Sequence, residues 1–293
     1  MTSLRQRMIE DMQVRNFSMH TQASYVLQIS QFARYFGKSP ALLGPMEIRA
    51  YQVYLTNEKK LAPSSILIAV AALRFLYNVS LHKDWNVGDI IPAPKRPQRL
   101  PIVLSPEEVR HFLDCVASPK HRVILTACYA AGLRVSEAVR LKSTEIDSQR
   151  MVIRVVQGKG QKDRYVMLSP RLLEVLREWW LIERPTSWLF PGSTADRHIG
   201  TETVQWACER AHRLSGITKP ITPHSLRHAF AVHLLESGTD VRRIQLLLGH
   251  RSLATTANYL RIANNKVCST TSPFDLLPQL PAAQTSSAVP NTL

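Results

Sequence analysis

The sequence has few cysteines and no long apolar run, and both shortages narrow the class of protein. Its four cysteines, Cys115, Cys128, Cys208 and Cys268, lie far apart in 293 residues and form no CxxC pair. This spacing argues against a disulfide scaffold and against a zinc or redox motif. No uninterrupted apolar run reaches about 18 residues, and the N-terminal segment lacks the apolar region of a signal peptide, so we expect neither a membrane span nor a secretory leader.

Acidic residues are scarce relative to basic ones. The chain has 37 Lys and Arg against 22 Asp and Glu, a net charge of +15 and a pI near 10.0. The excess is spread along the chain, with 13 basic and 6 acidic residues in 1–100 and 24 and 16 in 101–293. The alternative is a merely basic soluble protein, but this distribution favours a polyanion that both halves contact. We expect a protein of a reducing compartment, the cytoplasm.

A proline-rich stretch divides the chain. Residues 92–101 hold four prolines, which disfavour helix and strand pairing and indicate an extended connector. Its basic residues, Lys95, Arg96 and Arg99, are candidates for contact with phosphates. Directly after it, Ser105 and the Pro-Glu-Glu that follows have the pattern of a helix start: a capping Ser, Pro at the first helical position and a capping Glu.

Both sides of this connector are predicted to be mostly helical. Apolar residues recur at helical spacing before it, and prolines separate what we interpret as four short helices. In the second half, residues 151–156 and 164–168 are rich in strand-forming residues and are joined by a glycine-containing turn, which predicts a hairpin. The prediction is a mainly α fold with a small antiparallel β-sheet. Its parts are a helical domain over 1–91, a linker over 92–104, a second domain over 105–268 and a flexible tail over 269–293.

Two segments of the second domain combine glycine with basic residues. Gly132 is a natural end for the apolar helix before it, so Arg134 would lie near the start of the next helix, a favourable place to bind phosphate. Glu137 lies one turn on and could orient Arg134. In residues 157–164, glycines flank Lys159 at the tip of the predicted hairpin, and GxxxxGK[ST] is absent. The alternatives are an ordinary helix–helix turn and a solvated basic hairpin.

Two further segments place histidines on helices. Thr222 and the Pro after it start a helix that carries His224 and Arg227 on one face. A zinc site at His224 and His228 is the alternative, but HExxH is absent and no acidic third ligand is near. In the last segment Gly249 ends a helix and Ser252 caps the next, so His250 lies between them and Tyr259 falls two turns into the second helix. A single helical Tyr usually serves packing.

Taken together and in order, the four segments resemble the tyrosine site-specific recombinases, the phage-integrase family, and most closely its Xer-like members. The matching patterns are Gly-Leu-Arg-x-Ser-Glu (132–137), Gly-Lys-Gly-x-Lys-x-Arg (158–164), His-x-Leu-Arg-His (224–228) and Leu-Gly-His-x-Ser-x-x-Thr-Thr-x-x-Tyr (248–259). The resemblance covers about residues 105–262, and the first domain resembles the family's core-binding domain less specifically. It implies a two-domain, C-shaped clamp around DNA.

The resemblance also implies a reaction without metal or ATP. Tyr259 would attack a phosphodiester to give a 3′-phosphotyrosyl bond, while Arg134 and Arg227 bind the non-bridging oxygens. His224 would be the general base toward the tyrosine or hold the geometry of its proton transfer, and Lys159 would be the general acid for the leaving 5′-oxygen. The full implied catalytic set is Arg134, Lys159, His224, Arg227, His250 and Tyr259, with Glu137 in support. His250 would contact the phosphate or Tyr259. Lys162 and Arg164 join the three linker residues as expected DNA contacts.

The implied partner is double-stranded DNA with paired recombination half-sites. Four protomers would assemble on two duplexes and exchange strands through a Holliday junction, and residues 273–277 of the tail could dock on a neighbouring protomer. A DNA-binding regulator that does not cut and a nicking–closing enzyme of the type IB topoisomerase kind are alternatives. A zinc hydrolase is a third. The relaxation of supercoiled plasmid without target sites separates the second of these from a recombinase.

Overall fold

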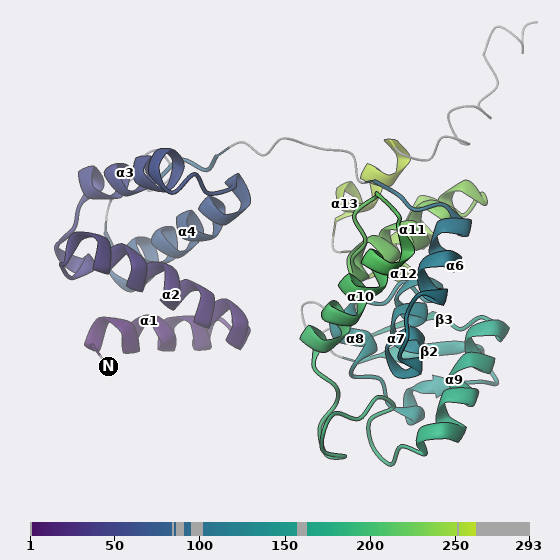
Figure 1. Cartoon of the computed structure of the whole chain (residues 1–293). Coiled ribbons are helices and arrows are strands. Elements are labelled where there is room, and N and C mark those ends of the chain that lie inside the picture. Colours follow the sequence, from purple (N-terminus) through teal and green to yellow (C-terminus); the bar gives the residue numbers. More distant parts are fainter. Residues whose placement is uncertain are drawn as a thin grey trace, which may run out of the picture. The chain divides into compact units, whose positions relative to one another are not determined.

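The computed structural model describes residues 2–83, 85, 91–94, 102–156, 163–250 and 252–261, apart from the side chains of residues 258 and 261. The chain divides into two compact units, Met1–Arg99 and Leu100–Leu293 (Figure 1). Several residues singled out in the sequence lie outside the described part: Lys95, Arg96, Arg99, Lys159, Lys162 and residues 269–293.

The first unit is helical throughout its described part. Its helices are α1 (Ser3–Val14), α2 (Met19–Phe36), α3 (Pro45–Val53) and α4 (Pro63–Phe75), with a 3-10 turn at Pro40–Leu42 and π-helical turns at Tyr54–Glu58 and Leu76–Ser80. Proline begins α3 and α4, where its fixed φ suits the first helical position and its missing N–H costs nothing. The helix α2 starts at the Ser18 cap and ends at Gly37, which has a φ of +62°. The four predicted helices are found among the described residues of this unit, although α2, with 18 residues, is longer than the short helices expected.

The core of the first unit lies between α2 and α4 and their neighbours. Phe32, Ile48, Leu73 and Tyr77 are almost fully buried there. The stretch Pro63–Ser80 is long and apolar enough by composition to pass for a membrane span, and half of it is buried inside this unit. A core helix of a folded domain meets the same criterion.

The second unit is also mainly helical. Its helices are α6 (Pro106–Asp114), α7 (Pro119–Ala130), α8 (Val135–Ala138), α9 (Pro170–Glu183), α10 (Thr201–Ser215), α11 (Pro223–Glu236), α12 (Val241–Leu248) and α13 (Leu253–Ala257), with 3-10 turns at Ser143–Glu145 and Asn258–Arg261. The predicted start of α6 is confirmed. The Glu108 N–H donates to Ser105 Oγ at 3.2 Å, and the Ser105 N–H donates to Glu108 Oε2 at 2.7 Å.

One antiparallel sheet of three strands lies in the second unit. The predicted hairpin is formed by β2 (Val152–Val155) and β3 (Arg164–Met167), which pair from Val152 opposite Met167 to Val155 opposite Arg164. A third strand, β1 (Ile146–Asp147), pairs with β2 and was not expected, because two residues carry no strand periodicity. Ile153, Val155 and Val166 face the core and Arg154 faces solvent, the alternation expected of a sheet with one buried face.

Two packed groups hold the helices of the second unit together. The larger one surrounds α7, which packs on α9, α10 and α11, and it buries Ile124, Phe112 and Leu226 completely. The smaller one joins the end of α11 to α12 and to the last helical turn, and it includes Phe230, Leu248 and Tyr259. Tyr259 was expected two turns into a helix. In the structure α13 ends at Ala257, and Tyr259 lies in the 3-10 turn that follows.

Candidate functional site

The turn after α7 places Arg134 at the start of α8. Gly132, just beyond α7, has a φ of +62°, a conformation that glycine adopts without strain. The backbone N–H of Arg134 donates to Glu137 Oε2 at 2.8 Å. Its Nη1 donates to Oε1 of the same carboxylate at 2.7 Å. Glu137 therefore fixes both the backbone and the side chain of Arg134.

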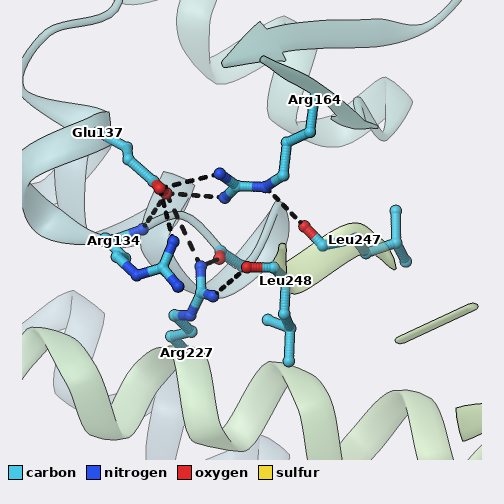
Figure 2. Close-up of polar contacts among 7 residues, drawn as sticks. Arg134, Glu137, Arg164, Arg227, Leu247 and Leu248 are labelled. Carbon is cyan, nitrogen blue, oxygen red and sulfur yellow. Dashed lines mark hydrogen bonds and ion pairs between the residues drawn. The ribbon is translucent and has the colours of Figure 1, made fainter. Parts of the chain in front are cut away.

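Glu137 also binds Arg164 of β3. Nη1 and Nη2 of Arg164 donate to the two carboxylate oxygens at 2.9 and 2.8 Å, and its Nε donates to the Leu247 carbonyl at 3.0 Å (Figure 2). Only 11% of the Arg164 side chain is exposed. Its place in a basic hairpin predicts a DNA contact. The guanidinium faces protein groups instead, because Glu137 and the end of α12 approach it.

Arg227 is the third guanidinium near Glu137, with its Nη1 3.7 Å from Oε2. It lies on α11 and is 1% exposed. Nη1 donates to the carbonyl of Gly132 and Nη2 to the carbonyl of Leu248 (Figure 2). The Leu248 carbonyl is the last of α12, so the partial negative charge of that helix end faces the cation, and the Gly132 carbonyl comes from the turn beyond α7. We call Arg134, Glu137, Arg164 and Arg227 the arginine cluster.

Two glycines allow the backbone to approach this cluster. A Cβ at Gly132 would lie 2.5 Å from the Phe230 ring, and a Cβ at Gly249 would lie 2.9 Å from Cδ of Arg164. Both residues have a φ of +62°. A larger residue at either position would meet strain and steric conflict together.

The charges of the arginine cluster are strongly coupled. Burial by itself would raise the pKa of Glu137, but hydrogen bonds and charge from Arg164 and Arg134 lower it to about 2. Burial and the charge of Arg134 lower the pKa of Arg227 to about 10. Glu137 and Arg227 are therefore both ionised at neutral pH. Three guanidiniums surround one carboxylate, so the cluster keeps a surplus of positive charge that suits an anion.

Three histidines and a tyrosine lie beside the arginine cluster. The Tyr259 hydroxyl is 2.6 Å from Nδ1 of His228. The His250 ring is nearly parallel to the Tyr259 ring, with centroids 6.5 Å apart, and its Nδ1 is 2.9 Å from Oγ1 of Thr256. The His224 ring meets the His228 ring edge-on, with centroids 4.3 Å apart. We call His224, His228, His250 and Tyr259 the histidine–tyrosine group.

This group is uncharged at neutral pH. Burial and nearby positive charge lower the pKa of His228 and of His250 to about 4, and they lower the pKa of His224 as well. Burial raises the pKa of Tyr259, although Arg227 and Arg134 act in the opposite direction. Tyr259 is 4% exposed and carries its proton. As a nucleophile it would need a group to take that proton.

The structure gathers five of the residues singled out in the sequence: Arg134, His224, Arg227, His250 and Tyr259. They come from α8, α11, the turn after α12 and the turn after α13. Besides burial, the charges of Arg227 and Arg134 lower the pKa of His250. Two cationic forks, neutral imidazoles and a phenol therefore share one place in the second unit. Such a set can bind a phosphate and present a hydroxyl to it.

The contact of His228 with Tyr259 was not predicted from the sequence, where His228 is named only in the alternative of a zinc site. In the structure its Nδ1 lies 2.6 Å from the Tyr259 hydroxyl. The available signal was its place four residues after His224, on the same face of α11. Among the described residues, no group of three or more His, Cys, Asp or Glu side chains is arranged to hold a metal ion.

Two family models match the chain. The model of the phage integrase family matches residues 103–266, and the model of the phage integrase N-terminal SAM-like domain matches residues 4–87. The first match spans the arginine cluster and the histidine–tyrosine group. The second spans the helices of the first unit.

Individual proteins of known family are also similar to this chain over most of its length. The protein y4qK of Sinorhizobium fredii is 69% identical over 95% of this chain and 91% of its own length. A tyrosine recombinase of Pseudothermotoga lettingae is 33% identical over 87% of this chain and 92% of its own. The crystal structure of the XerA recombinase has a TM-score of 0.52 and 29% identity, and the match covers 92% of this chain and 99% of XerA.

Proposed function

Because the chain belongs to the phage integrase family of tyrosine recombinases, we propose that it is a site-specific recombinase that breaks and rejoins DNA strands through a 3′-phosphotyrosyl intermediate. The observation that carries the proposal is the place of the buried Tyr259 phenol, 2.6 Å from the residue that follows Arg227, while Arg227 and Arg134 share the carboxylate of Glu137. This is the minimum that a phosphoryl transfer to tyrosine requires: a cationic clamp and a hydroxyl beside it.

The two arginines suit the clamp. The transferring phosphoryl group gathers negative charge on its non-bridging oxygens, and guanidinium forks match those oxygens in charge and shape. Arg227 is fixed by backbone carbonyls and Arg134 by Glu137, so neither must be ordered when DNA binds. A guanidinium has five N–H donors, and the bond to Glu137 uses only part of the capacity of Arg134.

The chemical step exchanges one phosphate ester for another. The Tyr259 oxygen bonds to phosphorus as the bond from phosphorus to the 5′-oxygen breaks, the phenolic proton passes to a histidine, and Lys159 gives a proton to the leaving 5′-oxygen. The free 5′-hydroxyl of a partner strand then attacks the phosphotyrosine and releases the enzyme. Phosphate ester bonds are conserved throughout, so ATP is not required, and Arg134 and Arg227 supply the positive charge that a metal ion would otherwise supply.

The partner is double-stranded DNA with paired half-sites, bound by a homotetramer on two duplexes that passes through a Holliday junction. The helical domain of residues 1–91 and the basic linker residues Lys95, Arg96 and Arg99 contact DNA, together with Lys162. The net charge of +15 supports a polyanionic partner. We place the activity in the cytoplasm.

A suicide substrate tests the proposal. DNA from the flanks of the gene, nicked beside the candidate crossover, traps a covalent protein–DNA adduct that survives a denaturing gel. We expect an adduct with the wild-type chain in EDTA and none with Tyr259→Phe, which keeps the ring and removes the nucleophile. Tight binding without an adduct on any flanking substrate would indicate a regulator that does not cut. Relaxation of a plasmid that carries no target site would indicate a topoisomerase.

A further inference from the structure

The hydroxyl of Tyr259 has one side-chain partner at hydrogen-bond distance among the described residues, and that partner is His228. The Oη–Nδ1 distance is 2.6 Å, short enough for a well-formed bond. The two residues are 31 positions apart and come from α11 and the 3-10 turn after α13. The bond therefore ties the turn that carries the phenol to a helix that the fold has already fixed.

The choice of helix matters for the reaction. His228 follows Arg227 directly in α11. The residue that contacts the phenol and the arginine proposed to bind the phosphate are therefore neighbours in one helix. Arg227 is itself bound to the carbonyls of Gly132 and Leu248. The hydrogen bond to His228 therefore fixes the phenol oxygen relative to this anchored helix. Misplacement of a reacting atom by about 1 Å can cost about 100-fold in rate.

The other two histidines of the group are engaged differently. His250 directs its Nδ1 to Thr256, and its ring lies alongside Tyr259 without a bond to the hydroxyl among the described contacts. His224 is the exposed member of the group and meets His228 through its ring. His224 and His250 are therefore available to contact the phosphate, whereas His228 contacts the hydroxyl of the proposed nucleophile.

We propose that His228 is a positioning residue for Tyr259, which holds the phenol oxygen in line for attack by a hydrogen bond to Nδ1. The inference rests on the proposed function, because it assigns Tyr259 the role of nucleophile. His228 remains neutral at physiological pH, since burial and the neighbouring His224 and Arg227 lower its pKa to about 4. A neutral ring with its proton on Nε2 accepts the phenolic hydrogen at Nδ1.

Two substitutions at residue 228 separate the hydrogen bond from the shape of the ring. His228→Leu removes every polar atom. His228→Asn keeps a polar atom where Nδ1 lies, because the Asn amide overlays the part of the imidazole nearest the backbone. The measurement is the single-turnover rate of adduct formation at saturating suicide substrate, with the DNA dissociation constant measured separately.

We expect His228→Leu to lower the cleavage rate about 10- to 100-fold while the DNA dissociation constant changes less than about twofold. His228→Asn should recover most of that rate. A positioning role predicts this split between rate and binding and this rescue. A merely structural role would lower the amount of active protein and leave the rate of the folded fraction unchanged.

The same helix offers a matched control. His233 of α11 also pairs through Nδ1 with a tyrosine hydroxyl, that of Tyr129, at 2.9 Å. It further contacts the carbonyl of Leu104 at 2.9 Å, so its replacement removes at least as much structure. We expect His233→Leu to lower the melting temperature and to leave the cleavage rate of the folded protein unchanged.

A stability cycle checks the contact without using activity. The drop in melting temperature caused by His228→Leu should be smaller in the Tyr259→Phe background, where the bond is already absent. Equal drops in both backgrounds would show that the two side chains do not interact and would overturn the proposal.

Three kinetic outcomes would also overturn it. They are cleavage by His228→Leu at the wild-type rate, faster cleavage, which would make the contact a restraint on the nucleophile, and no rescue by His228→Asn. These are distinguishable from failure of the proposed function. In that case the wild-type chain itself forms no adduct on any substrate, and the role of His228 falls with it.

Discussion

The arginine cluster and the histidine–tyrosine group lie side by side in one unit but are stabilised in different ways. The cluster is ionic, and Arg164 and Arg227 are bound to main-chain carbonyls as well as to Glu137. The histidine–tyrosine group is neutral. Its polar contacts run between side chains, and Tyr259 lies on a short turn after a helix of five residues.

This difference assigns separate tasks to the two regions. The charge that a phosphate needs is in place before any ligand binds, because the backbone and Glu137 hold it there. The same positive charge, with burial, keeps His228 and His250 neutral by lowering their pKa values to about 4. In the proposed mechanism, the phenol of this neutral half could then leave His228 for phosphorus while the arginines of the charged half stay bound to their carbonyls and to Glu137.

Removing a guanidinium from the charged half should produce the largest effect. Arg227→Ala takes away a preorganised donor to the transition state, and we expect the cleavage rate to fall about 10²- to 10³-fold. It also leaves the carbonyls of Gly132 and Leu248 without this donor. Single-turnover adduct formation measures the loss.

Arg227→Lys is the control for charge alone. Lysine keeps the positive charge but lacks the planar guanidinium, so it cannot bind two carbonyls and a phosphate at the same time in the way that arginine can. We expect it to bind DNA nearly as well as the wild type and to cleave slowly. A rate close to that of the wild type would show that charge, and not the anchored fork, is what the cluster supplies.

Substitution of Glu137 tests how far the stability of the arginine cluster depends on its single carboxylate. Glu137→Gln should destabilise the second unit by about 3 kcal/mol at pH 7, because a side chain only 6% exposed and with a pKa of about 2 loses its ion pairs. Urea unfolding measures the change. No loss of stability would mean that the three guanidiniums do not need the carboxylate.

The pH dependence of stability provides the second arm of that test. The pKa of Glu137 is lower in the folded chain than the usual 4.5, so its contribution is full above about pH 5 and is lost as the pH falls toward 2. In Glu137→Gln this part of the dependence should disappear. The wild-type and variant curves should therefore converge only below about pH 2, the pKa of Glu137 in the folded chain.

Much of this site follows from local sequence signals. Ser105 and the residues after it have the capping pattern of α6, Gly132 ends α7, and the two strand-forming runs pair as predicted. The four motifs place Arg134 and Arg227 correctly on their helices. These features depend on residues that are only a few positions apart in the chain, so they can be predicted from a single sequence.

The partners of distant residues could not be predicted in the same way. Arg164 looks like a surface residue of a basic hairpin until Glu137, 27 positions earlier, and Leu247, 83 positions later, are brought to it. His228 appears in the sequence only as half of an alternative zinc site, and its contact with Tyr259, 31 positions later, becomes visible only in the fold. The 3-10 turn at Tyr259 is set by packing on α11, which leaves no periodicity in the sequence.

The close approach at Gly132 tests whether the backbone anchors the charged half. Gly132→Ala combines a φ of +62° with a Cβ 2.5 Å from the Phe230 ring, and we expect a loss of about 2–4 kcal/mol of stability. Gly216 is the matched control, because its φ is +65° and its Cβ would meet nothing within 4 Å. Gly216→Ala should cost only about 1–2 kcal/mol.

Equal losses at the two glycines would mean that Phe230 moves aside readily. The carbonyl of Gly132 would then be a weak anchor for Arg227. Cleavage rates measured for the folded Gly132→Ala protein give an independent reading. If the anchor matters, the rate falls together with the stability, and Gly216→Ala leaves the rate unchanged.

The smallest effect should come from the neutral half. Thr256→Val replaces a buried hydroxyl with a methyl group of the same shape and removes the bond at 2.9 Å to His250 Nδ1. We expect a loss of about 1 kcal/mol in urea unfolding, the usual cost of one such bond. Because His250 then turns more freely beside the phenol, the cleavage rate should fall by a larger factor than DNA affinity does. An equal loss of rate and affinity would place His250 with the arginine cluster as part of the phosphate clamp, and the division between the charged half and the neutral half would have to be redrawn.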